Sequence, residues 1–310
     1  MLQKKEKPPV LEVNDLSICF RMYDRGLNQK ELKVISNLDI AINAGEILAV
    51  VGSSGSGKSL LAHAILGILP SNSSWAGSMR YCGRELTPRL QRKLRGKEIA
   101  LVPQSVGYLD PMMHVGKQVS GIHGSEKQQQ DVFRRFGLVP ETAQKYPFQL
   151  SGGMARRVLV STAVITDAHL IIADEPTPGL NAEVAEETMR YFREIADQGN
   201  AVMLITHDID LALSIADKIA VFYAGTTVEI APVQDFIAGK DHLRHPYTKA
   251  LWDALPQNDF IPISGLQPYA GSLPSGCPFA PRCRLRTDAC TGTIEMRELR
   301  EGEVRCKHAT

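Results

Sequence analysis

Long apolar runs, an excess of charge of one sign and internal repeats are missing from this sequence, and each absence excludes a class of protein. No run approaches the ~20 apolar residues that a helix needs to cross a bilayer. The 35 basic and 34 acidic residues give a net charge of +1, which leaves no electrostatic footprint for nucleic acid. Without a repeat, the chain is not a fusion of two copies of one domain.

The start of the chain also lacks the apolar segment of a secretory signal peptide. Residues 1–9 read MLQKKEKPP and are rich in charge instead. We therefore expect a protein that stays in the cytoplasm, where thiols are normally reduced.

The chain does contain the alternation that is typical of an α/β fold. Up to about residue 238, short apolar runs alternate with longer amphipathic stretches. Two of the runs are apolar throughout, as expected of parallel strands that are buried on both faces. The predicted strands are residues 48–51, 99–102, 170–173, 202–205 and 219–223.

Two regions depart from this alternation. Residues 105–165 are more polar and helical in pattern, which predicts a helical subdomain inserted into the sheet domain. Residues 244–256, RHPYTKALWDALP, predict a helix, and the segment after them is rich in Pro and Gly. We divide the chain into a larger α/β domain at 1–238 and a small Cys-rich extension at 239–310.

A phosphate-binding loop follows the first predicted strand. The segment GSSGSGKS matches G-x-x-x-x-G-K-[ST] in full, between a strand-like ILAVV and a helix-forming LLAHAIL. Its backbone N–H groups and the start of the next helix are suited to bind phosphates. Lys58 should reach the β- and γ-phosphates of ATP, and the Ser59 hydroxyl should ligate Mg²⁺. The loop consists of Gly52, Ser53, Ser54, Gly55, Ser56, Gly57, Lys58 and Ser59.

Polar side chains also end two later strands. The run LIIADE ends in Asp174, placed to hold Mg²⁺ directly or through water, and Glu175, which can polarise an attacking water. His207 follows the strand VMLIT at the edge where parallel α/β sheets bind ligands.

The order of five motifs makes the prediction specific. The P-loop, Gln104 after IALVP, LSGG before a helix, IIADEPT and ITHD follow one another as in ABC-transporter ATPases, which this sequence resembles. The resemblance implies a P-loop NTPase core and a role for each motif. Gln104 would join the Mg²⁺ site and link it to membrane subunits, Glu175 would be the catalytic base and His207 the switch histidine.

The resemblance also implies contacts beyond the P-loop. Ser151, Gly152 and Gly153 would form the signature motif, which contacts the γ-phosphate of ATP bound to the opposite subunit. Phe20 would stack on adenine, with Tyr23 as the alternative.

The C-terminal part of the chain resembles a narrower group. RHPYTKALWDALP, GCPFAPRCRLRTDAC and VRCKH are similar to the extension of dipeptide, oligopeptide and nickel importer ATPases. This implies a peripheral subunit on the cytoplasmic face of the inner membrane that hydrolyses ATP to drive peptide import, or else import of nickel or a metal chelate. The implied partners are a second ABC ATPase, two membrane permease subunits and an extracytoplasmic binding protein. A soluble ABC ATPase that acts on DNA or ribosomes is the alternative of another class.

One segment departs from the family pattern. Where members usually read DEPTTALD, this chain reads DEPTPGLN, so that Gly179 and Asn181 replace Ala and Asp. Since that Asp helps to join the two nucleotide sites, the change favours an asymmetric heterodimer of ATPases.

Four of the six cysteines lie in the last 34 residues. Their spacing is not that of a CxxC zinc site. The resemblance to the peptide-importer tail favours a [4Fe–4S] cluster on Cys277, Cys283, Cys290 and Cys306, with zinc or no metal as alternatives. Cys19 and Cys82 are expected to be small apolar fillers.

Overall fold

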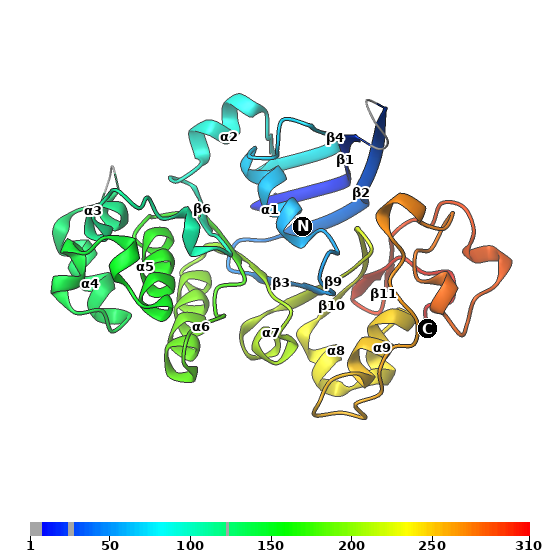
Figure 1. Ribbon diagram of the computed structural model, residues 1–310. Helices are drawn as coiled ribbons and strands as arrows, with labels where there is room; N and C mark the ends of the chain where they lie inside the picture. The colour runs from blue at the N-terminus through cyan, green and yellow to red at the C-terminus, as the bar shows by residue number, and fades with distance from the viewer. Residues whose placement is uncertain (1–7, 24–27, 122–123) are drawn as a thin grey trace, which may run out of the picture.

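The computed structural model describes residues 8–23, 28–121 and 124–310. The larger of its two sheets consists of β3 (Ile47–Gly52), β6 (Ile99–Val102), β7 (Leu170–Asp174), β8 (Ala201–Ile205), β9 (Lys218–Tyr223), β10 (Thr226–Pro232), β11 (Arg297–Leu299) and β12 (Gly302–Val304). The smaller sheet consists of β1 (Leu11–Tyr23), β2 (Gln29–Ile42), β4 (Ser73–Tyr81) and β5 (Arg84–Glu85). Figure 1 shows the smaller sheet above the larger one, with a group of helices at the left.

The helices are α1 (Lys58–Leu66), α2 (Pro88–Leu94), α3 (Val115–Ser120), α4 (Glu126–Arg135), α5 (Gly152–Val164), α6 (Ala182–Asp197), α7 (Ile209–Ile215), α8 (Val233–Ala238) and α9 (Pro246–Asp253). Short 3₁₀ helices are η1 (Val106–Tyr108), η2 (Pro140–Gln144), η3 (Pro147–Gln149), η4 (Lys240–His242), η5 (Ala270–Ser272), η6 (Ala280–Arg282) and η7 (Asp288–Cys290). Among the described residues, no helix combines the length and the apolar character that a membrane crossing requires.

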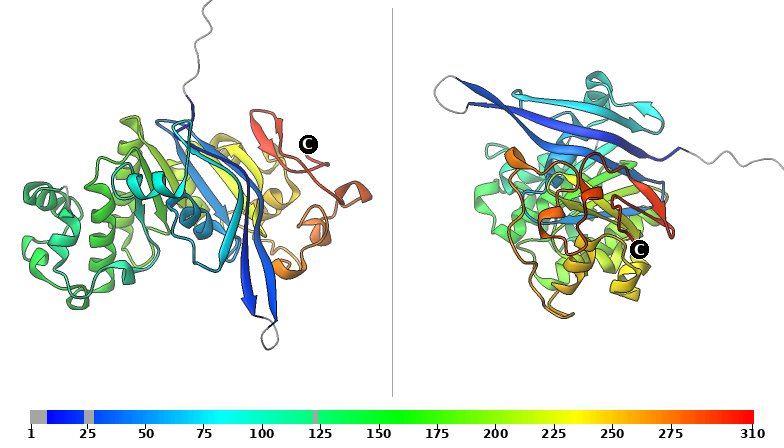
Figure 2. Two further views of the ribbon diagram at one scale, coloured as in Figure 1. Left: turned by 90° about the horizontal axis from the view of Figure 1, so that it is seen from above. Right: turned by 90° about the vertical axis from the view of Figure 1, so that its right-hand side faces the viewer.

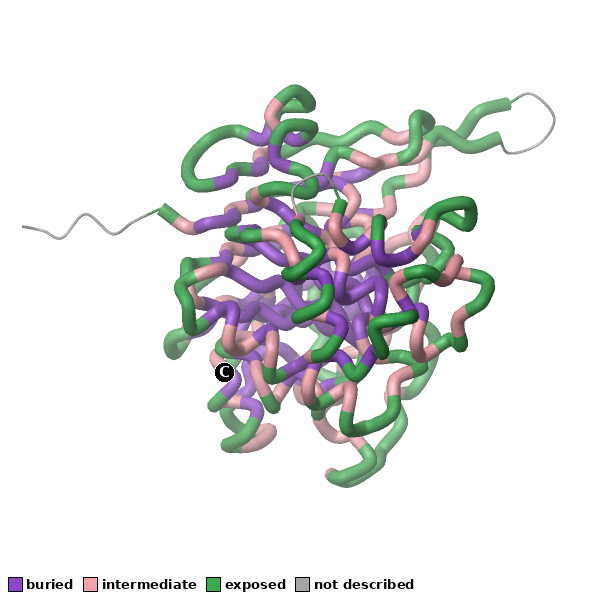
Figure 3. Tube along the Cα trace, turned by 90° about the vertical axis from the view of Figure 1, so that its left-hand side faces the viewer, coloured by how far each residue is buried: buried purple, intermediate pink, exposed green. Residues whose placement is uncertain are grey.

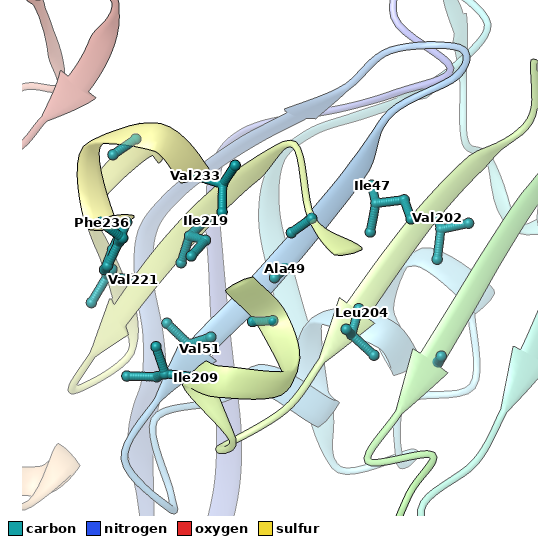
Figure 4. Packing of buried hydrophobic residues seen from close by; sticks show 14 of the residues in the cluster. Ile47, Ala49, Val51, Val202, Leu204, Ile209, Ile219, Val221, Val233 and Phe236 are labelled. Carbon is teal, nitrogen blue, oxygen red and sulfur yellow. The ribbon is translucent and has the colours of Figure 1, made fainter. Parts of the chain in front are cut away.

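The larger sheet is buried on both faces at its centre. In β3, Ile47, Ala49 and Val51 belong to one core cluster, while Leu48 and Val50 belong to another. This division follows from the period of two along a strand. Figure 4 shows the first cluster, in which side chains from α7 and α8 pack on these strands. Figure 3 shows buried residues concentrated along the central strands, with exposed residues at the periphery.

Parallel pairing brings the ends of the central strands together. The sheet order is β11-β12-β10-β9-β3-β8-β7-β6, and β9, β3, β8, β7 and β6 pair in parallel. The carboxyl ends of β3, β7 and β8 therefore meet at one edge, where α/β sheets place their ligands.

Helix α1 lies between the two sheets. Its residues Leu61 and Ile65 join the second core cluster together with Ile18 of β1 and Ile40 of β2. The antiparallel smaller sheet thus covers the helix that follows the P-loop. Figure 2 shows its β1–β2 hairpin reaching beyond the rest of the molecule.

Helices α3, α4 and α5 form a separate group between β6 and β7. Their core is a third cluster that includes Val119, Phe133 and Val158. Helix α5 also packs on β6, which joins this group to the larger sheet.

The five predicted strands are present as β3, β6, β7, β8 and β9, so the predicted α/β fold is confirmed. The predicted helix at 244–256 is shorter, because α9 begins at Pro246 after the capping residue His245 and ends at Asp253.

The expectation for Cys82 was wrong. Cys82 is exposed and has a φ of 48° in the turn between β4 and β5, so it fills no apolar space. Cys19 is half-buried.

The C-terminal region continues the larger sheet, since β12 pairs with β10. Arg244 joins the two parts. Its guanidinium lies 2.7 Å from Asp235 and 3.4 Å from Glu229, and it also donates to the carbonyls of Leu299 and Arg300. The side chains of Arg244 and Glu229 are both fully buried. A buried pair of this kind is costly to break, because the remaining charge has no water around it.

We predict that Arg244→Met lowers the free energy of unfolding by about 3 kcal/mol, because Glu229 would keep a buried charge without its partner. Chemical denaturation measures the change. Arg284→Met is the matched control, since Arg284 is exposed and should tolerate the same substitution. Equal losses in the two variants would contradict this role of Arg244.

Candidate functional site

The P-loop connects β3 to α1 and adopts a shape that requires glycine. A Cβ on Gly52 would lie 2.3 Å from the carbonyl oxygen of Phe222, and Gly57 has a φ of 97° at the start of α1. The Lys58 ammonium donates to the carbonyl oxygens of Gly52 at 2.8 Å and Ser53 at 3.1 Å. Burial lowers the pKa of Lys58, and the nearby carboxylates of Glu175 and Asp174 oppose this shift.

One cavity of about 630 Å³ brings most of the predicted residues together. It is lined by P-loop residues 54–59 and by Gln104, Asp174, Glu175 and His207. Gly52 and Ser53 lie at the beginning of the same loop. The volume lies within the usual range for a site that binds a small molecule.

Asp174 is well placed to bind a divalent cation. Burial raises its pKa, as does the neighbouring Glu175, while a hydrogen bond with Ser59 opposes the rise. Its Oδ1 atom is buried and has no hydrogen-bond partner among the described residues. A hydroxyl beside a buried carboxylate oxygen suits Mg²⁺, which prefers oxygen ligands.

Glu175 and His207 form a pair at the same edge. His207 Nδ1 lies 2.9 Å from both carboxylate oxygens of Glu175. Glu175 adopts a φ of 49°, a conformation that costs a non-glycine residue about 1–2 kcal/mol. Such strain is common where a side chain must point into a functional site. A carboxylate in this place can accept a proton from a water that approaches the cavity.

Arg156 is a member of this site that the sequence analysis missed. Its guanidinium is buried and donates to the carbonyl of Pro103 at 3.1 Å. It therefore links α5 to the residue before Gln104. Burial lowers the pKa of Arg156, and the nearby carboxylates of Glu175 and Asp174 oppose this shift. The sequence feature that could have indicated a buried arginine is the Arg pair in the otherwise apolar helix ARRVLVSTAVI.

The structure does not bring the signature residues to the P-loop cavity. Ser151 caps α5 by accepting from the Met154 amide, and Gly152 and Gly153 form its first turn. A Cβ on Gly152 would meet open space. The N-terminus of this 13-residue helix therefore offers amides to a group outside the P-loop cavity of its own chain.

The β1 pairing separates the two candidates for adenine stacking. Phe20 pairs with Leu32 of β2 and packs, partly buried, against the second core cluster. Tyr23 points to the opposite face because it is an odd number of residues away, and it is 67% exposed. Phe20 is the better candidate, although it does not itself line the cavity.

The four C-terminal cysteines line one small cavity together with His245, His308 and others. Burial, together with the neighbouring Cys306 and Cys283, raises the pKa of the Cys277 thiol to about 11. Within the described residues, no group of three or more His, Cys, Asp or Glu side chains is arranged to hold a single metal ion.

Comparison with known proteins identifies the family. Residues 35–178 match the family described as ABC transporter, and residues 228–290 match the C-terminal region of oligopeptide/dipeptide transporters. The oligopeptide transport ATP-binding protein OppD of Haemophilus influenzae is 33% identical, over 96% of this chain and 96% of that protein. OppD of Salmonella typhimurium is 34% identical, over 96% and 92%. The chain belongs to the oligopeptide-transport family of ABC ATP-binding proteins.

Solved structures agree on the fold of this ABC ATPase. The dimeric bacterial ABC transporter cassette MJ0796 superimposes with a TM-score of 0.64 and 22% identity, over 72% of this chain and 98% of that one. The same cassette in a post-hydrolysis state with ADP and phosphate gives a TM-score of 0.63, also at 22% identity.

Local structure accounts in part for Gly179 and Asn181, the two residues of DEPTPGLN that differ from the usual family pattern. Gly179 adopts a φ of 83°, which glycine accepts more readily than alanine. Asn181 caps α6 by accepting from the Val184 amide at 3.1 Å. Asp would cap equally well, so the cap alone does not explain the missing charge.

We predict that Glu175→Gln lowers the rate of ATP hydrolysis at least ~100-fold, because the amide cannot accept a proton from water. ATP affinity should change little, since the side chain keeps its shape. Phosphate release and ATP binding measure the two effects. The exposed Glu183 of α6 provides the control, Glu183→Gln, and full activity in Glu175→Gln would exclude this carboxylate as a base.

Proposed function

We propose that this chain hydrolyses ATP to drive the import of peptides through a membrane transporter. The observation that carries the proposal is similarity over nearly the whole chain, C-terminal region included, to proteins named oligopeptide transport ATP-binding proteins. The geometry of the P-loop cavity supports ATP as the energy source.

The residues in and around the cavity have distinct proposed roles. The P-loop amides and Lys58 hold the phosphates, and Phe20 stacks on adenine. Ser59, Asp174 and Gln104 would hold Mg²⁺, directly or through water, and the cation would neutralise phosphate charge. Glu175 accepts the proton of the attacking water while His207 fixes the orientation of the carboxylate.

An exposed surface of the helical group suits a membrane partner. Tyr108 is 56% exposed and Met112 83% exposed, a few residues after Gln104. Nearby along α3 and η3, His114, Tyr146 and Phe148 stack, with centroids 4.2 Å and 5.5 Å apart. Exposed aromatic and Met side chains are typical of docking surfaces. We propose that a cytoplasmic segment of a permease subunit docks here, which places the chain at the cytoplasmic face of the membrane.

A second ATPase completes the proposed assembly. The free N-terminus of α5 would contact the γ-phosphate held by that partner, whose own signature would contact ATP on this P-loop. Because Asn181 lacks the charge usual at this position, we propose that the partner is a different ABC ATPase. Two permease subunits and an extracytoplasmic binding protein would supply the peptide.

Peptide uptake by cells that express this chain with its permease subunits and binding protein tests the function. We predict that Lys58→Ala lowers uptake of labelled peptides at least ~10-fold, because the P-loop loses its phosphate-binding ammonium. Lys93→Ala, at an exposed lysine of α2, is the control. Loss of nickel uptake with normal peptide uptake would favour the nickel alternative. If the chain is recovered only in the soluble fraction, and not with membranes, when its permease subunits are co-expressed, an ATPase that is not coupled to transport would be favoured.

We also propose a [4Fe–4S] cluster in the extension. The donor set fits, since Cys277, Cys283, Cys290 and Cys306 line one cavity and all four can serve as thiolate ligands. When bound, the cluster would cross-link residues 277–306, a segment that contains short 3₁₀ helices and the short strands β11 and β12.

We predict about four iron atoms and four acid-labile sulfides per chain after anaerobic purification. The double variant Cys283→Ser, Cys290→Ser should lose both, because two of the four ligands are removed. Cys82→Ser should keep them, since Cys82 is exposed on a turn of the smaller sheet. Zinc in place of iron, or no metal at all, would overturn the cluster proposal and leave the ATP site unaffected.

A further inference from the structure

Ser53, the second residue of the P-loop, is held from two directions. Within the loop, its carbonyl oxygen accepts from the Ser56 amide at 3.2 Å and from the Lys58 ammonium at 3.1 Å. From outside, two residues of the C-terminal extension reach it. Its hydroxyl donates to Gln267 Oε1. Burial raises the pKa of Tyr247, and the nearby side chain and backbone of Ser53 oppose this rise. Ser53 thus connects the extension to the residue that organises Lys58.

Packing and hydrogen bonds hold Tyr247 in place. Its side chain is 2% exposed, and its ring lies 4.4 Å from that of Tyr223 and 5.3 Å from that of Phe279. Its amide donates to Nδ1 of the capping residue His245, whose own amide donates to the buried Glu229. The hydroxyl that meets Ser53 is therefore fixed by packing and by hydrogen bonds of the helix that carries it.

Gln267 lies in an irregular segment that is held just before it. The Arg282 guanidinium donates to the carbonyl oxygens of Ile263 at 2.8 Å and Ser264 at 2.7 Å. Gly265 follows with a φ of 77°, and the chain then reaches Gln267, which is half-buried against the P-loop. The contact with Ser53 therefore comes from an anchored part of the extension.

We propose that Tyr247 and Gln267 are positioning residues of the ATP site, which act by fixing Ser53. A glycine-rich loop has many conformations, and ordering it on ligand binding costs free energy. By holding Ser53 beforehand, the two residues reduce that cost and keep the Ser53 carbonyl in place for Lys58. The C-terminal extension is thereby part of the nucleotide site. This inference rests on the ATP site alone and is independent of the transported substrate.

Nucleotide affinity of the full chain tests the proposal. Titration calorimetry with MgADP and with a non-hydrolysable ATP analogue should show about 3- to 10-fold weaker binding for Tyr247→Phe and for Gln267→Ala, as expected for loss of a hydrogen bond. In the assembled transporter, the KM for ATP should rise while kcat at saturating ATP changes less than about twofold. A purely structural defect would lower kcat as well.

Two controls match the variants. Tyr191→Phe removes a hydroxyl that donates to the Val164 carbonyl at 3.3 Å, away from the P-loop. Gln257→Ala removes an amide of the same extension that donates to Asp210. Both should bind nucleotide as the unchanged chain does.

Several results would overturn the proposal. Unchanged affinity in Tyr247→Phe and Gln267→Ala would do so, and so would equal losses in the controls, since affinity would then follow general stability. If Tyr247→Phe unfolds, which thermal denaturation detects, Gln267→Ala decides the question because its side chain is only half-buried. Failure of the unchanged chain to bind ATP would refute the site itself, whereas failure of peptide uptake would leave this inference intact.

Discussion

Close backbone packing around the P-loop is the constraint on which the rest of the site depends. A Cβ on Gly52 would lie 2.3 Å from the Phe222 carbonyl oxygen, and one on Gly225 would lie 2.1 Å from that of Val34. These contacts fix the loop to the end of β9 and the turn after β9 to β2. Parallel register then aligns the neighbouring strand ends, because Glu175 donates its amide to Ile205 and Thr206 donates to Val50. The carboxylates, His207 and the loop consequently face one cavity.

Opposing charges balance within that cavity. Asp174 and Glu175 are both buried, and each would be costly without a cation nearby. Lys58 and Arg156 are buried beside them, and the two carboxylates oppose the lowering of the pKa that burial causes in both cations. Arg156 also holds the carbonyl of Pro103, so the charge balance of the cavity connects the sheet to the helical group that the proposed membrane partner would contact.

The sequence allowed prediction of features that are local in the chain. The P-loop, the acidic strand end and the central strands each depend on a few consecutive residues, and the structure contains the strands where they were expected. The antiparallel sheet of β1, β2 and β4 was not predicted, because its strands carry many exposed polar residues and because β1 also pairs with β4, which is distant along the chain. Arg156 and the contacts of Tyr247 and Gln267 with Ser53 were missed for the same reason. Cys82 was expected to fill apolar space, but it is exposed and lies in a turn with a positive φ.

One chain provides only part of the proposed nucleotide site. The signature residues Ser151, Gly152 and Gly153 are not among the residues that line its P-loop cavity. The most direct test is the ATPase rate per chain as a function of concentration, measured alone and with the proposed partner ATPase. Our account predicts that the rate per chain rises with the concentration of partner until it saturates, because two chains must meet to enclose each nucleotide. A constant rate per chain at all concentrations, with or without partner, would mean that one chain is sufficient and would contradict the account.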